Sequence, residues 1–99
     1  MTENTRRIIK EINIIPRGKV SCYGDIARKA GLPNGARQVV RVLHSLAEKY
    51  NLPWYRVLKI DGFIALENGA GAELQAALLR DEGVEVSDQG WVDLAKFKM

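Results

Sequence analysis

The chain has 99 residues, of which 46% are hydrophobic, and it carries a formal net charge of +3 at pH 7. This length predicts one domain, residues 1–99, and the mildly basic balance is typical of proteins that bind polyanions. No apolar run approaches the ~18 residues that span a membrane, and the N-terminal residues lack the apolar core of a signal peptide. We therefore expect no membrane partner and a cytoplasmic location, associated with the nucleoid if the protein is prokaryotic.

The first half of the chain predicts three helices. Isoleucines at helical spacing predict a helix over residues 5–15, which Pro16 ends. Ser21 is placed to cap a second helix over residues 23–30. A third helix, over residues 36–49, has an apolar stripe and an opposite polar face. The residues of that polar face are Arg37, Gln38, Arg41, His44 and Glu48. A short helix, a glycine-containing turn and a longer helix with a basic face predict a helix-turn-helix.

The second half of the chain predicts a small hairpin. Asp61-Gly62 lies between the apolar runs 57–60 and 63–66, and this arrangement is a strong hairpin signal. Together with the preceding helices, the hairpin predicts a mainly α fold, a winged helix-turn-helix domain.

The C-terminal part predicts one more helix and an anchored tail. The helix covers residues 72–82 and Gly83 ends it, while residues 84–86 have the composition of a short strand. The residues expected to face inward from the helix are Leu74, Ala77 and Leu78. The residues expected to anchor the tail are Trp91, Leu94 and Phe97.

The polar face of the third predicted helix is a candidate nucleic-acid surface. Arg37 and Arg41 lie one turn apart with Gln38 beside them, and such side chains contact phosphates or base edges. The alternative is an ordinary solvated helix face. Tyr23, at the start of the second predicted helix, is placed to bind a phosphate near free backbone N–H groups, or to pack as a half-buried structural residue. Ser21 combines the roles of helix cap and phosphate contact.

The order of motifs along the chain resembles the DNA-binding half of the alkylguanine-DNA alkyltransferases. The motifs are IPRGKVSCYGDIA at residues 15–27, GARQVV at residues 35–40 and LPWYRV at residues 52–57. In the enzymes the last motif contains Pro-Cys-His-Arg-Val, and its cysteine accepts the alkyl group. Trp54 stands here in place of that cysteine, and Tyr55 in place of the histidine. The resemblance therefore implies an alkyltransferase-like protein of this family, made of the DNA-binding domain without its nucleophile.

The resemblance also implies how DNA is gripped. In the family, the helix-turn-helix enters the minor groove and an arginine at the start of the recognition helix takes the place of a rotated nucleotide. The matching residue is Arg37, whose planar guanidinium can stack on bases, and the small residues Gly35 and Ala36 before it permit a close approach to the duplex. A tyrosine that rotates the 3′ phosphate in the family matches Tyr23.

A pocket for the alkylated base is implied around the altered signature. The indole of Trp54 has no thiolate-like form and cannot be an alkyl acceptor, but it can line an apolar pocket or pack against a base. The alternative for Trp54 and Tyr55 is that they are core aromatics. The residues implied for the pocket are Pro53, Trp54, Tyr55, Arg56, Val57 and Glu67.

Two acidic residues have implied roles near this pocket. Glu82 matches the carboxylate that supports the catalytic histidine of the enzymes, and here it is expected to pair with Arg56 or to hydrogen-bond Tyr55. Arg56 is expected to brace the pocket through carbonyls or a carboxylate. Glu67 stands where several alkyltransferase-like proteins have a basic residue that packs on the flipped base.

These observations favour a non-enzymatic sensor of O6-alkylguanine in double-stranded DNA, acting as a monomer and flagging the lesion to nucleotide excision repair proteins. One alternative is an enzyme that transfers an alkyl group to Cys22 or acts as a glycosylase. Another is a winged-helix regulator that reads a sequence in the major groove. One cysteine excludes an internal disulfide, and one cysteine with one histidine argues against a zinc site, so we expect no metal and no cofactor.

Overall fold

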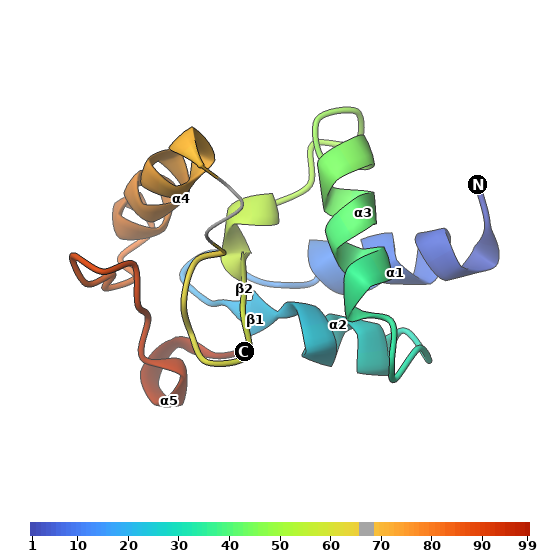
Figure 1. Ribbon diagram of the computed structural model, residues 1–99, viewed down its shortest axis with the longest axis horizontal. Helices are drawn as coiled ribbons and strands as arrows, with labels where there is room; N and C mark the ends of the chain where they lie inside the picture. Colours follow the sequence, from blue (N-terminus) through green and yellow to red (C-terminus); the bar gives the residue numbers. More distant parts are fainter. Residues whose placement is uncertain (66–68) are drawn as a thin grey trace.

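The computed structural model describes residues 1–65 and 69–99, and it is mainly helical as the sequence predicts (Figure 1). The elements in chain order are α1 (Glu3–Asn13), β1 (Ser21–Cys22), α2 (Tyr23–Lys29), α3 (Ala36–Leu46), the 3-10 helix η1 (Trp54–Arg56), β2 (Val57–Leu58), α4 (Ala70–Asp81) and α5 (Leu94–Phe97). Figure 1 shows α3 standing over α1 and α2 on one side of the short β1–β2 sheet, with α4 and α5 on the other side. Over the described ranges, no helix is long and apolar enough to cross a membrane.

The helix-turn-helix is held together by a tight turn between α2 and α3. Leu32 N–H donates to Ala27 O at 2.8 Å, and Gly35 N–H donates to Leu32 O at 2.8 Å. A Cβ on Gly35 would lie 2.8 Å from the Leu32 Cβ and 3.0 Å from the Leu32 O, so this turn accepts only glycine without rearrangement. The turn sets the angle at which α3 leaves α2.

Two apolar cores meet at the sheet. The first lies between α1, α2 and α3 and contains Ile8, Ile12, Ile26, Val39 and Val57, among others. The second lies under α4 and the C-terminal segment and contains Val20, Leu58, Leu79, Val84 and Val92, among others. Val57 and Leu58 are neighbours in β2 and enter different cores because successive strand side chains point to opposite faces. This short strand therefore joins the two halves of the molecule.

The turn of the predicted hairpin forms, but the predicted pairing of its strands is wrong. Gly62 N–H donates to Lys59 O at 2.9 Å, and Lys59 N–H donates to Phe63 O at 3.0 Å. The strand before this turn, β2, pairs in parallel with β1, with Ser21 opposite Val57 and Cys22 opposite Leu58. Phe63 instead forms an antiparallel bridge with Trp91. Pairing partners more than 25 residues away displace the local hairpin, and turn chemistry cannot reveal them.

The buried face of α4 also differs from the prediction. Gln75 and Leu79 are fully buried, whereas Leu74 is 53% exposed and Ala77 is exposed. The amide Nε2 of Gln75 donates to Tyr55 O and to Val57 O, each at 3.1 Å. A hydrophobic pattern ranks glutamine as a surface residue, but here its amide satisfies two carbonyls of η1 and β2 that the core would otherwise leave unpaired. Residues 84–86, predicted as a strand, form no strand.

The C-terminal segment is anchored as predicted. Leu94 and Phe97, on α5, pack against the second core. Val20 N–H donates to Phe97 O at 3.0 Å, and Met99 N–H donates to Val20 O at 2.9 Å. Trp91 stays partly exposed, and its Nε1–H donates to Asp61 O at 2.9 Å. These contacts tie the tail to the loop after β2 and to the strand before α2.

Candidate nucleic-acid interface and pocket

The polar face of α3 is solvent-exposed, as the sequence predicts. Arg37, Gln38 and Arg41 are exposed, and Arg37 is the second residue of the helix. Ala36 is half-buried at the first position, directly after the glycine turn. The start of α3 thus combines small residues with an exposed guanidinium, and the proposed contacts of these side chains with DNA remain a prediction.

Tyr23 is the first residue of α2 and is half-buried, with its side chain in the wall of a hollow beside α3. Ser21 is only 2% exposed because it lies in β1, between β2 and the interior. The N-cap of α2 is Cys22, which makes no side-chain capping hydrogen bond. The prediction that Ser21 caps this helix is therefore wrong, while its contact with a phosphate stays a prediction.

The first turn of α2 is tied to the C-terminal segment. Asp25 forms an ion pair with Lys98, and Arg28 Nη2 donates to its Oδ1 at 3.0 Å. The hydrogen bond from Lys98 lowers the pKa of Asp25 most strongly, so the carboxylate stays ionised. Lys98 also bridges to Val20 through the backbone. The tail therefore fixes the turn that presents Tyr23.

A hollow of about 450 Å³ lies between α3 and η1. The residues that line it are Tyr23, Val40, Leu43, His44, Ala47, Glu48, Asn51, Leu52, Trp54 and Tyr55. Two of the residues predicted for an alkylguanine pocket, Trp54 and Tyr55, are in this wall. The sequence prediction missed the contribution of α3, although His44 and Glu48 continue the polar face that begins at Arg37, at helical spacing.

Three other residues predicted for the pocket do not line it. Val57 is fully buried in the first core, and Arg56 turns away toward Glu82. Pro53 is half-buried and precedes the wall. A linear motif brings these residues together in sequence, but the 3-10 turn at 54–56 sends successive side chains in different directions. Glu67, the remaining predicted pocket residue, lies outside the described residues.

Contacts outside the hollow hold its aromatic residues, Trp54 and Tyr55, in place. The rings of Trp54 and Tyr55 meet edge to face, with centroids 6.0 Å apart and planes at 88°, which is a favourable arrangement for two aromatic rings. The Tyr55 hydroxyl donates to Glu82 Oε2 at 2.9 Å, and the Arg56 guanidinium lies 5.3 Å from the centre of the Tyr55 ring. Trp54 is therefore presented to the hollow by neighbours that cannot readily rotate.

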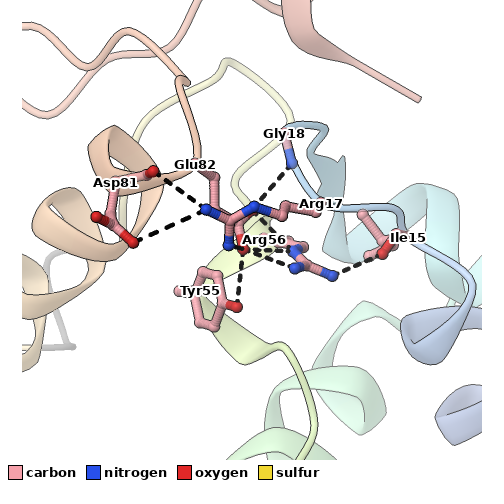
Figure 2. Close-up of polar contacts among 7 residues, drawn as sticks. All are labelled: Ile15, Arg17, Gly18, Tyr55, Arg56, Asp81 and Glu82. Carbon is pink, nitrogen blue, oxygen red and sulfur yellow. Dashed lines mark hydrogen bonds and ion pairs between the residues drawn. The ribbon is translucent and has the colours of Figure 1, made fainter.

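Glu82 is the centre of this support (Figure 2). Arg56 donates to it through Nη2 at 2.6 Å and through Nε at 3.0 Å, and Gly18 N–H donates at 3.0 Å. Figure 2 shows the Arg56 guanidinium between Glu82 and Ile15, whose carbonyl accepts from Nη1 at 2.9 Å. Both roles predicted for Glu82, pairing with Arg56 and hydrogen-bonding to Tyr55, are confirmed, as is the bracing role of Arg56.

These contacts change the proton affinities of the cluster. Burial by itself would raise the pKa of Glu82, but hydrogen bonds from Arg56, Gly18 and Tyr55 outweigh burial and lower the pKa from 4.5 to about 2. Burial and the neighbouring carboxylate raise the pKa of Tyr55, so its hydroxyl remains a donor. Glu82 is therefore an acceptor, and Tyr55 a donor, throughout the neutral range.

The depressed pKa of Glu82 predicts acid sensitivity. Because the folded-state pKa lies below the unfolded value, the stabilisation is complete above about pH 4.5 and is lost as the pH falls toward 2. A shift of this size corresponds to about 3 kcal/mol. Urea unfolding at pH 7 and at pH 2.5 measures the loss. In Glu82→Gln, the same pH change should cost about 3 kcal/mol less than in the wild type, and an equal loss in both proteins would contradict the assignment.

Cys22 is a poor candidate for a nucleophile. Its side chain is buried, and burial together with the nearby Asp25 raises the pKa of the thiol. A thiol that is neutral and inaccessible reacts slowly because the thiolate is the reactive form. Among the residues that the structure describes, no group of three histidine, cysteine or carboxylate side chains is arranged to hold a metal ion.

The fold and the polar face of α3 define a helix-turn-helix DNA-binding domain with a pocket beside the recognition helix. A family model described as the DNA-binding domain of 6-O-methylguanine DNA methyltransferase matches residues 3–84. The chain therefore belongs to this family, which confirms the resemblance that its motifs indicate.

Several relatives are similar over nearly the whole chain. A DNA base-flipping protein of Vibrio parahaemolyticus is 45% identical over 92 residues, which cover 93% of this chain and 91% of that protein. Alkyltransferase-like protein 1 of Schizosaccharomyces pombe is 39% identical over 87 residues, covering 87% of this chain and 81% of the relative. The crystal structure of S. pombe Atl1 in complex with damaged DNA containing O6-carboxymethylguanine matches with a TM-score of 0.88 and 35% identity, over 100% of this chain and 96% of that one.

Proposed function

We propose that this protein binds O6-alkylguanine in double-stranded DNA, rotates the damaged nucleotide into the hollow beside Trp54, and performs no chemistry on it. The observation that carries this proposal is the position of Trp54. By the resemblance of residues 52–57 to the family signature it stands in place of the alkyl-accepting cysteine, and in the structure it lines a hollow of about 450 Å³ next to α3. Relatives named for base flipping, and a solved complex of a relative with damaged DNA, support the same function.

The arrangement suits minor-groove binding with base flipping. The exposed face of α3 lies against the duplex, with Arg41 and Gln38 near the backbone. Arg37, at the start of α3, fills the space that the rotated nucleotide leaves, and Tyr23 turns the adjacent phosphate. Flipping costs a few kcal/mol of stacking and pairing, and it costs less at a damaged pair. This difference contributes to selectivity before any contact with the adduct forms.

The same residues explain binding without alkyl transfer. The indole of Trp54 cannot accept an alkyl group. Tyr55 stands in place of the family's histidine, and its hydroxyl donates a hydrogen bond to Glu82, so it is not a general base. Cys22 is buried and is not part of the hollow. A lesion that is bound but not repaired marks its position in the duplex, and the bound monomer recruits nucleotide excision repair proteins to it.

Binding titrations on matched duplexes test this function. Duplexes with and without one O6-methylguanine are otherwise identical, and the protein should bind the modified duplex more tightly. Equal affinities would overturn the proposal and fit a sequence-reading regulator instead. Mass spectrometry of the whole reaction after incubation should show no added methyl group on the protein and no released base. A gain of one methyl group on the protein, or a released base, would show that the protein is an enzyme.

Arg37→Ala should weaken binding to the modified duplex by about ten-fold or more, because the stacked guanidinium that replaces the nucleotide is lost. A fluorescent base analogue beside the lesion reports flipping directly, and its signal change should fall in the variant. Arg6→Ala is the matched control, since Arg6 is an exposed arginine on α1. If both variants behave alike, Arg37 acts only through its charge and the intercalating role is wrong.

A further inference from the structure

The wall of the hollow contains one acidic side chain. Among the described residues that line it, Glu48 is the only aspartate, glutamate, lysine or arginine. Glu48 lies just after α3 and is exposed to the hollow and to solvent. Its backbone carbonyl accepts from Asn51 N–H at 3.2 Å, which closes the turn that leads into the aromatic wall.

The size of the hollow places an entering adduct within range of Glu48. Because Glu48 is in the wall of a hollow of only about 450 Å³, a charge on an adduct inside it lies on the order of 10 Å or less from the carboxylate. At that distance, and at the intermediate dielectric of a partly exposed site, one like charge costs enough to change a dissociation constant about three- to ten-fold. The apolar opposite wall, formed by Trp54 and Tyr55, offers an anion no compensating charge.

We propose that Glu48 makes this pocket select O6-alkylguanine adducts by their charge, so that adducts with a neutral hydrogen-bonding end or a cationic end bind in preference to anionic adducts of the same size. This inference rests on the proposed function and names the class of lesion that the site favours. Glu48 is a specificity-determining residue that acts at the far end of the adduct, whereas Arg37 and Tyr23 act on the DNA.

Two adducts of equal size separate charge from shape. O6-carboxymethylguanine carries an anion, and O6-carbamoylmethylguanine replaces the carboxylate with a neutral amide of the same number of heavy atoms. The quantity measured is the ratio of the two dissociation constants, carboxymethyl over carbamoylmethyl, from titrations of otherwise identical duplexes. In the wild type the ratio should exceed one. In Glu48→Gln it should fall about three- to ten-fold, and in Glu48→Lys it should fall further.

Glu11→Gln is the matched control, because it removes the same charge from α1, which contributes no residue to this hollow. Its ratio should equal that of the wild type. An unchanged ratio in both Glu48 variants would overturn the inference, while tighter binding of both adducts than of unmodified DNA would still support the proposed function. If neither adduct is bound more tightly than unmodified DNA, the proposed function and this inference both fail.

Discussion

Glu82→Ala is expected to lower the free energy of unfolding by about 3–5 kcal/mol, a large part of the 5–15 kcal/mol that stabilises a typical domain. The Glu82 side chain is 2% exposed and accepts from the neighbours Tyr55 and Arg56 and from Gly18, which lies in a distant part of the chain. Removing it leaves a half-buried guanidinium without its counter-charge and two polar hydrogens without an acceptor. Urea unfolding followed by circular dichroism measures the change.

A surface ion pair provides the control for this prediction. Glu85 is 73% exposed and pairs with Lys96 at 2.9 Å, and Glu85→Ala should cost no more than about 1 kcal/mol. If Glu82→Ala costs no more than Glu85→Ala, the buried cluster is not a source of stability. The double variant Arg56→Met/Glu82→Leu should recover part of the loss, because an apolar pair of similar volume leaves no buried charge.

Trp54→Ala is expected to reduce affinity for a duplex with O6-methylguanine by about ten- to one hundred-fold, while affinity for the unmodified duplex changes less than about two-fold. Loss of an aromatic platform typically costs 1–3 kcal/mol for each base it contacts. On the proposed function, unmodified DNA is bound through phosphates and does not use the hollow. The preference for the modified over the unmodified duplex should therefore be lost, while the affinity for unmodified DNA is largely kept.

Trp91→Ala is the matched control for Trp54→Ala. Trp91 is the second tryptophan of the chain, and its indole donates to Asp61 O, away from the hollow. This variant should keep the lesion selectivity of the wild type, although it loses stability. An equal loss of affinity for modified and unmodified duplexes in Trp54→Ala would show that Trp54 supports the fold only, which is the alternative of a core aromatic.

The cluster around Glu82 contains a contact that the family resemblance implies. The resemblance to the alkyltransferases implies a carboxylate that supports a catalytic histidine, and Tyr55 now takes the place of that histidine. The hydrogen bond from Tyr55 to Glu82 is retained at 2.9 Å, but its consequence is mechanical. It orients Tyr55, which in turn meets Trp54 edge to face.

Much of this protein is determined by short stretches of sequence. Isoleucine periodicity indicates α1, the glycine turn before Arg37 indicates the helix-turn-helix, and the motif at residues 52–57 indicates the family. Each of these signals is local, because helix periodicity, turn chemistry and a contiguous motif are all contained within a few residues. The pairing of Glu82 with Arg56 followed from the family resemblance and not from any local pattern.

Only the tertiary structure decided which segments meet. Four features depend on partners that are distant in sequence. They are the parallel pairing of β1 with β2, the burial of Gln75 against two carbonyls, the burial of Ser21, and the position of Glu48 in the wall of the hollow. The residue pattern of one segment does not show which hydrogen-bond donors and acceptors of another segment will pair with it. A strand or a buried amide finds its partner through the packing of the whole chain, and that packing is a property of the complete fold.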